Sequence, residues 1–192
     1  IGEFFLNKTL NSQNIAFISI DSGIGAGIVL DENLYKGHSS KAGEFGHFTV
    51  ENHGRKCNCG NNGCLEMYCS NRALIKEFQE RFNLSNLSFV EIFSKGLADT
   101  EKGKEILERY TDYLAAGIRN ILFLLDLDKV IIGGLIANYS KYIEEDLKKK
   151  IFNNIFLEDE TTLEFSKHGD FSNLIGAAFL PFNDLFITTM TK

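Results

Sequence analysis

The feature that most constrains this chain is a group of three cysteines, Cys57, Cys59 and Cys64, in the string CNCGNNGC, with His47 ten positions upstream. Cysteines separated by one residue are poorly placed to bridge each other. One His and three Cys make a closed tetrahedral ligand set for zinc, and the glycines between them let the backbone turn sharply. The pattern predicts a structural zinc site on a loop, because residues 43–63 have no helical period.

Two alternatives stay open at this point. His53 lies closer to Cys57 and is a second candidate for the fourth ligand, and the cysteines are otherwise ordinary free thiols beside a surface histidine. A fourth cysteine, Cys69, falls where a helix begins, and we expect it to be a small buried apolar residue rather than a ligand.

Composition limits the classes of protein that this chain can belong to. The 192 residues carry a net charge of −6, with 44% hydrophobic residues and 17 Phe, which is typical of one globular domain. An acidic chain gives no broad electrostatic grip on nucleic acid. Its apolar runs are far shorter than the roughly 20 residues of a membrane span. The first residues, IGEFFLNK, lack both a Met and a signal peptide, so we expect a truncation point in a cytoplasmic protein.

The first third of the chain is typical of antiparallel strands. Ile15 to Val29 reads as two strands around a glycine-lined turn, and the polar residues 31–33 mark a second turn before a third short strand. Further on, Lys129 to Gly134 has the apolar pattern of a buried strand closed by two glycines, and Leu163 to Phe165 is a candidate last strand.

Helical spacings dominate the remainder. Ser70 is a candidate cap for a helix that carries Leu74, Ile75, Phe78 and Phe82, and a longer helix is expected from about Glu101 to Leu125. A helix after Gly134 should bury Tyr142, Ile143, Leu147 and Ile151 and end in Lys148 to Lys150, expected to be a solvated face. A closing helix is expected over 173–179. Together these elements predict an α/β domain with a mixed sheet.

Two strings are specific enough to indicate a family. AGEFGHFTV at residues 42–50 and CNCGNNGCLEMYCS at residues 57–70 resemble the signature of the ROK family of bacterial sugar kinases and sugar-responsive transcriptional repressors. IDSGIGAGIV resembles the family's second phosphate-binding loop, KVIIGG its adenosine-site turn, and SNLIGAAF its closing helix. The resemblance implies the C-terminal lobe of an actin-like ATPase (ribonuclease-H-like) fold over residues 1–192, without the N-terminal lobe or any winged-helix domain.

The resemblance also implies site residues. By match to the family's motifs, His47, Cys57, Cys59 and Cys64 would bind zinc, and Glu44, His47 and Glu66 would hold sugar hydroxyls. A neutral His can bind a metal through one ring nitrogen and donate from the other. Without the resemblance, Glu44 and Glu66 would read as exposed carboxylates. In a kinase, ATP and Mg²⁺ would bind at the glycine turns, through Ser22, Gly23, Gly25, Gly133 and Gly134.

Departures from the kinase pattern favour a regulator. The family's catalytic Asp and first phosphate loop are not in this chain, and residues 1–3 resemble those just after the catalytic motif. Asp21-Ser22 stands where kinases usually have Gly-Thr, and Leu135 stands where a third glycine is common. A carboxylate there would repel phosphate. We therefore expect the effector domain of a homo-oligomeric sugar-responsive repressor, with DNA bound by an upstream domain, ahead of half a hexose kinase or an interaction module without a ligand.

Overall fold

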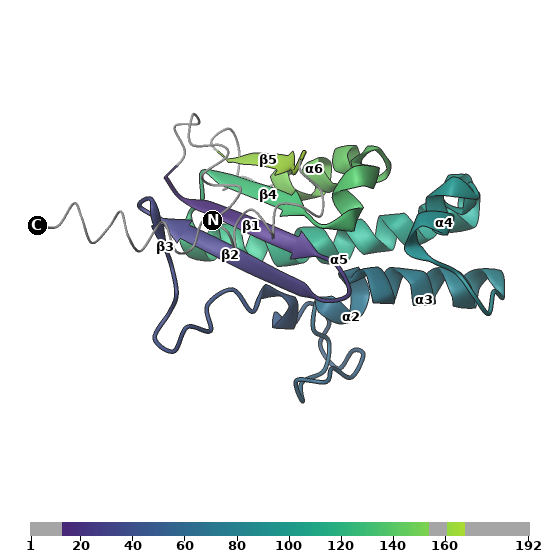
Figure 1. Cartoon of the computed structure of the whole chain (residues 1–192), viewed down its shortest axis with the longest axis horizontal. Helices are drawn as coiled ribbons and strands as arrows, with labels where there is room; N and C mark the ends of the chain where they lie inside the picture. Colours follow the sequence, from purple (N-terminus) through teal and green to yellow (C-terminus); the bar gives the residue numbers. More distant parts are fainter. Residues whose placement is uncertain (1–12, 154–160, 168–192) are drawn as a thin grey trace, which may run out of the picture.

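A single mixed sheet organises the computed structural model, which describes residues 13–153 and 161–167 (Figure 1). Its strands are β1 (Ile15–Ile20), β2 (Ile24–Leu30), β3 (Asn33–Leu34), β4 (Lys129–Gly133) and β5 (Thr162–Phe165), in the order β3-β2-β1-β4-β5. The first three strands pair antiparallel, whereas β1 with β4 and β4 with β5 are parallel. The predicted α/β domain with a mixed sheet is confirmed.

Strand composition explains this order. Every residue of β4 is buried, as expected of a strand with neighbours on both edges. In β1 the side chains of Ala16, Ile18 and Ile20 are fully buried, and they alternate with half-buried residues along the strand. The two turns after β1 and β2 fall where glycine and polar residues predicted them, and Asp31 and Glu32 adopt positive φ at the second.

The helices pack against the sheet and against one another. They are η1 (Phe45–His47), α2 (Glu66–Cys69), α3 (Asn71–Phe82), α4 (Phe89–Ser94), η2 (Leu97–Asp99), α5 (Glu101–Leu125), η3 (Leu135–Tyr142) and α6 (Glu144–Phe152). Figure 1 shows α5 running behind the sheet, with α3 alongside it and α4 at the far end. The predicted bounds of α5 are confirmed, and so is the cap of α3, where the Ser70 hydroxyl accepts from the amide of Ala73 at 3.2 Å.

One predicted helix is divided in two. The segment after Gly134 forms the 3-10 helix η3, which has a kink at Tyr139 with φ −118° and ψ 20°. Helix α6 begins only at Glu144, because Ile143 leaves helical geometry with φ −132° and ψ −21°. The Tyr139 ring stacks on Phe93 of α4 at 4.0 Å between centroids, which holds the residue in this position. Ile143, Leu147 and Ile151 are buried as predicted, whereas Tyr142 is only partly buried.

The expectation of a solvated lysine face is wrong for Lys150. Its side chain is 20% exposed and its ammonium binds the carboxylates of Asp112 at 2.7 Å and Asp146 at 2.8 Å. It also donates to the carbonyl of Glu108 at 2.8 Å. Burial opposes ionisation, but these two carboxylates raise the pKa of Lys150. The lysine therefore joins α5 to α6 rather than facing solvent alone.

The described helices include none long and apolar enough to cross a membrane. The predicted closing helix at 173–179 and residues 1–3 lie outside the described part of the chain.

Candidate metal and sugar site

The predicted ligand set converges in the structure. One nitrogen of His47 and the sulfurs of Cys57, Cys59 and Cys64 all lie within 4.8 Å of one another. His47 ends η1, and the cysteines occupy a hairpin-like loop with bridges between Thr49 and Cys64 and between Lys56 and Asn62. Gly63 adopts φ +73°, and a Cβ there would stand 1.7 Å from the carbonyl oxygen of Glu51. Glycine is therefore required where the loop turns back towards Cys64.

The distances between these atoms fit zinc. Tetrahedral bonds of about 2.3 Å to sulfur and about 2.0–2.1 Å to nitrogen put two sulfurs about 3.8 Å apart and sulfur and nitrogen about 3.6 Å apart. Cys59 Sγ lies 3.6 Å from Cys64 Sγ, and Cys57 Sγ lies 3.6 Å from His47 Nδ1. All four cysteines are free thiols. The group can hold one tetrahedral metal ion and leaves no protein ligand position open.

The structure separates these ligands from the other candidates. His53 is exposed at φ +60° and is not in the ligand group. Cys69 is fully buried at the end of α2, 3.5 Å from the carbonyl oxygen of Tyr110, as expected of a core residue.

Protons compete with a cation for this group. Burial, together with the neighbouring thiols, raises the pKa of Cys64 to about 12. A hydrogen bond from the backbone of Asn61 lowers the pKa of Cys59, the exposed member of the set. Since thiolates bind metal and thiols do not, binding of an ion releases protons and weakens as the pH falls.

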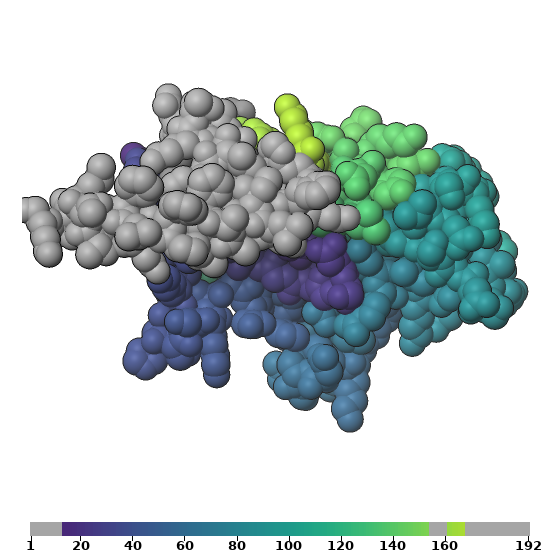
Figure 2. All heavy atoms as spheres, viewed as in Figure 1, coloured from purple at the N-terminus to yellow at the C-terminus, as the bar shows by residue number. Residues whose placement is uncertain are grey.

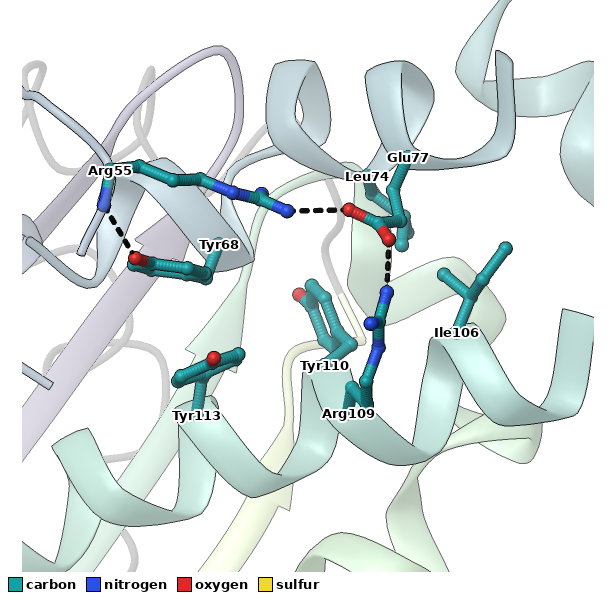
Figure 3. Close-up of a pocket in the computed structure, with 8 residues that line it drawn as sticks. All are labelled: Arg55, Tyr68, Leu74, Glu77, Ile106, Arg109, Tyr110 and Tyr113. Atoms are coloured by element: carbon teal, nitrogen blue, oxygen red, sulfur yellow. Dashed lines mark hydrogen bonds and ion pairs between the residues drawn. The ribbon is translucent and has the colours of Figure 1, made fainter. Parts of the chain in front are cut away.

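Arg55 joins the cysteine loop to the helices. Its amide donates to the Tyr68 hydroxyl at 2.7 Å, and its guanidinium donates to the Met67 carbonyl at 2.9 Å and to Glu77 Oε2 at 2.6 Å (Figure 3). The guanidinium also lies 4.7 Å from the centre of the Tyr68 ring. Figure 2 shows that the loop around residues 50–63 protrudes from the lower edge of the molecule, and the Arg55 contacts tie it to α2 and α3.

Replacing Arg55 should therefore loosen the cysteine loop. Charged hydrogen bonds are each worth about 1.5–3 kcal/mol when buried, but this side chain is 43% exposed, so solvent reduces the effect. In protein loaded with zinc, we expect Arg55→Ala to speed the transfer of the ion to a chelator roughly fivefold, measured by stopped-flow absorbance. The control is Arg81→Ala, elsewhere on α3, which removes an exposed ion pair with Glu105 of α5. Equal transfer rates in the two variants would contradict the anchoring role.

Glu66 is not the exposed carboxylate that its position on a first helical turn suggests. The residue is 8% exposed. Its Oε2 accepts from the amide of Ile24 at 3.1 Å, and its Oε1 pairs with Arg72 at 3.2 Å. A Cβ on Gly23 would stand 2.8 Å from Oε2, so glycine at this position leaves the space that the Glu66 carboxylate occupies. The result is a fixed acceptor beside the β1–β2 turn.

Glu44 and His47 lie on a segment that packs closely on β2. A Cβ on Gly43 would stand 1.8 Å from the carbonyl oxygen of Ala26, and one on Gly46 would stand 2.4 Å from that of Ile24. The Glu44 side chain is 68% exposed, and its Oε2 is 3.7 Å from His47 Nε2, longer than a hydrogen bond. His47 thus points one ring nitrogen at the sulfurs and the other towards Glu44.

The two glycine turns meet at one edge of the sheet. Because β1 and β4 are parallel and Ser19 pairs with Gly133, the turn after β1 and the turn after β4 are neighbours. Gly134 adopts φ +84°, and a Cβ there would stand 2.2 Å from the carbonyl oxygen of Ile20. Ser22 and Gly25 are exposed at this edge, as ligand-binding residues at the carboxyl ends of parallel strands often are.

Asp21 connects the two turns, a contact that the sequence does not reveal. Its Oδ1 accepts from the amide of Leu135 at 3.3 Å, and its Oδ2 accepts from the Ser19 hydroxyl at 3.0 Å. Its carbonyl accepts from the amide of Asn71 at 2.7 Å, which places the start of α3 on the same turn. The carboxylate therefore lies between the two glycine turns.

Comparison with known proteins supplies the family. The ROK family model matches residues 1–183. The chain is 31% identical over 155 residues to the xylose repressor of Bacillus subtilis and 37% identical over 171 residues to an N-acetylmannosamine kinase of Vibrio cholerae. It covers 40% and 57% of their lengths, using 81% and 88% of its own, so it spans about half of each relative.

The fold comparison agrees. A ROK family glucokinase from Streptomyces griseus, solved with glucose and AMPPNP, matches with a TM-score of 0.83 at 23% identity, over 93% of this chain and 64% of that one. The likeness establishes the actin-like ATPase fold. The relatives include both regulators and kinases. The family model covers nearly the whole chain, and the chain therefore belongs to the ROK family.

Proposed function

We propose that this chain is the sugar-binding effector part of a ROK transcriptional regulator. The observation that carries the proposal is the position of Asp21, whose carboxylate lies between the two glycine turns and accepts a hydrogen bond from the amide of Leu135. In a kinase of the family the turn after β1 would hold nucleotide phosphate and the turn after β4 would hold adenosine. A fixed anion beside the phosphate-binding turn repels phosphate oxygens, and it also occupies the amide of Leu135 in the adenosine turn.

The same edge of the domain keeps the features needed to bind a monosaccharide or sugar derivative. Glu66 is fixed by two partners, and each carboxylate oxygen retains acceptor capacity for vicinal hydroxyls. The segment that carries Glu44 and His47 and the carboxylate of Glu66 both contact Ile24, which supports their acting on one ligand. Zinc at His47, Cys57, Cys59 and Cys64 would be structural and would hold the sugar-binding segment in place.

In the regulator, the ligand acts by shifting the relative orientation of two lobes, of which this chain would be the C-terminal one. DNA affinity would change because the ligand binds one orientation better than the other. The DNA-binding winged helix would belong to another part of the polypeptide, and the whole would work as a cytoplasmic homodimer.

A second candidate is half of an ATP-dependent hexose or N-acetylhexosamine kinase. It is favoured by the 37% identity to an N-acetylmannosamine kinase and by the adjacency of the two glycine turns. ATP and Mg²⁺ would then bind through Ser22, Gly23, Gly25, Gly133 and Gly134, and the catalytic base would come from elsewhere in the polypeptide.

Ligand-dependent stability and ATP turnover distinguish these functions. We expect one sugar of a panel containing xylose, glucose, N-acetylglucosamine and N-acetylmannosamine to raise the melting temperature of the natural full-length protein by several degrees. Glu66→Gln should remove that shift, and Glu105→Gln, at an exposed helix position, should keep it. Sugar-stimulated ATP hydrolysis should be at background. Robust turnover would contradict the regulator and support the kinase. If no sugar shifts the melting temperature, both functions are contradicted.

A further inference from the structure

A polar groove lies between the cysteine loop, α2 and α3. Its volume is about 550 Å³, which lies within the roughly 300–1,000 Å³ of small-molecule clefts. The lining includes Glu66 but neither Glu44 nor His47, and it includes none of the four metal ligands. The groove therefore adjoins the candidate sugar site at one residue and extends it towards the cysteine loop.

Glu66 faces the two spaces with different oxygens. Its Oε2 accepts from the amide of Ile24 at 3.1 Å, beside the β1–β2 turn, whereas its Oε1 accepts from the guanidinium of Arg72 at 3.2 Å. Arg72 lines the groove, and its side chain is 63% exposed. The pair with Glu66 uses one of the five N–H donors of a guanidinium, so others remain for a ligand. A sugar unit bound at Glu66 thus lies next to free donors of the groove.

The rest of the lining carries charges of both signs. Glu77 binds Arg55 at 2.6 Å, and Glu80 lies 3.7 Å from Lys76. With Lys56 and the pair on Glu66, the lining holds four cations and three carboxylates. The carboxylates disfavour an anion and the cations disfavour a cation. A sugar hydroxyl both donates and accepts hydrogen bonds, so it suits a wall where donors and acceptors alternate.

Asn58 lines the groove from the cysteine loop, whereas Lys76 lines it from α3. Asn58 lies between Cys57 and Cys59, which both belong to the metal-ligand group. A metal ion bound to these two neighbours would fix the backbone that carries Asn58. Its side-chain amide offers a donor and an acceptor. The two walls of the groove therefore both present groups that can bind hydroxyls.

We propose that the ligand is an oligosaccharide of at least two units, with one unit held at Glu66 and the next in the groove. Arg72, Lys76 and Asn58 contact hydroxyls of the second unit. This inference rests on the sugar-binding function proposed above and adds the class of ligand. The groove lining includes no residue of the β1–β2 turn or of η1, so its volume is additional to the space that one unit occupies there.

Isothermal titration calorimetry of the natural full-length protein, loaded with zinc, tests this inference with matched saccharides. The pairs are xylose with xylobiose, glucose with cellobiose, and N-acetylglucosamine with N,N′-diacetylchitobiose. We expect the disaccharide of one pair to bind at least about tenfold more tightly than its monosaccharide, since each further hydrogen bond to a hydroxyl raises the affinity severalfold. A disaccharide that binds where its monosaccharide does not would give the same support.

Variants at the two walls locate the second unit. The double variant Asn58→Ala with Lys76→Ala should reduce the tenfold ratio to below about threefold, because it removes hydroxyl-binding groups from both sides. Both residues are exposed, so the fold should tolerate the change. The matched control is Lys104→Ala, which removes an exposed lysine of α5 paired with Glu101 and should keep the full ratio.

The outcomes separate this inference from the function on which it rests. Binding of monosaccharides alone, N-acetylmannosamine included, or equal binding within every pair would overturn the oligosaccharide ligand and leave the sugar-binding function in place. A tenfold ratio that persists in the double variant would also overturn it, because the second unit would then lie elsewhere. If none of these saccharides binds, the sugar-binding function is itself overturned.

Discussion

Cys57→Ser is expected to abolish stoichiometric zinc binding and to lower the melting temperature by about 10 °C. Cys57 is 2% exposed, and its sulfur lies 3.6 Å from His47 Nδ1, so serine removes a ligand at the centre of the group. Structural zinc contributes its binding free energy to folding. The backbone hydrogen bonds of the loop remain in the variant, so we expect the loss of the metal to cost only about 3–5 kcal/mol of unfolding free energy. In a chain of this size each kcal/mol lowers the melting temperature by about 2–4 °C.

Zinc content by mass spectrometry and melting by calorimetry measure the two parts of this prediction. The matched control is Cys69→Ala, which removes a buried thiol outside the ligand group. Cys69→Ala should be less stable than the parent chain, because it removes a buried sulfur from the core, yet it should retain about one zinc per chain. A Cys57→Ser protein that keeps its zinc, or a Cys69→Ala protein that loses it, would show that the ligand set is wrong.

Gly43→Ala is expected to cost about 3 kcal/mol or more, because two separate penalties coincide. The residue has φ +92°, a conformation that costs other residues about 1–3 kcal/mol. Its new Cβ would also stand 1.8 Å from the carbonyl oxygen of Ala26, whose amide donates to the Gly43 carbonyl at 2.7 Å. The contact cannot relax without breaking this bond, so the segment that carries Glu44 and His47 should leave β2 and zinc occupancy should fall.

Urea unfolding of the variant and the parent chain gives the difference in free energy directly. Gly25→Ala is the matched control, since a Cβ at that glycine meets nothing within 4 Å and the residue has no positive φ. We expect its effect to stay within about 0.5 kcal/mol. If the two variants are equally stable, the close packing of the 43–47 segment on β2 is contradicted.

Ligand chemistry and helix periodicity were readable from the sequence because both depend on local spacing. The cysteine cluster converges as its spacing indicates, and α5 has the predicted bounds, since its apolar residues repeat over 25 positions. Helix α4 was missed, although Ser88 and Glu91 form a capping box that marks its start. Six residues are too few for periodicity to stand out.

Contacts between distant segments were beyond sequence reasoning. Glu66 is buried because Ile24, 42 positions away, donates to it, and Asp21 reaches Leu135 across 114 positions. Lys150 lies in a run of three lysines, and only the packing of α5 on α6 sets it apart from its neighbours. Charge and residue type do not encode such partners, which arise when the sheet assembles.

The parallel pairing of β1 with β4 has a consequence for synthesis. Ile15 pairs with Lys129, 129 − 15 = 114 residues later. At about 5–20 residues per second, a ribosome needs roughly 6–23 s to supply the missing strand. During that interval the hairpin of β1 and β2 presents an open edge, which invites pairing with other chains. The cysteine loop is made in between, so its three thiols leave the ribosome before the sheet can close.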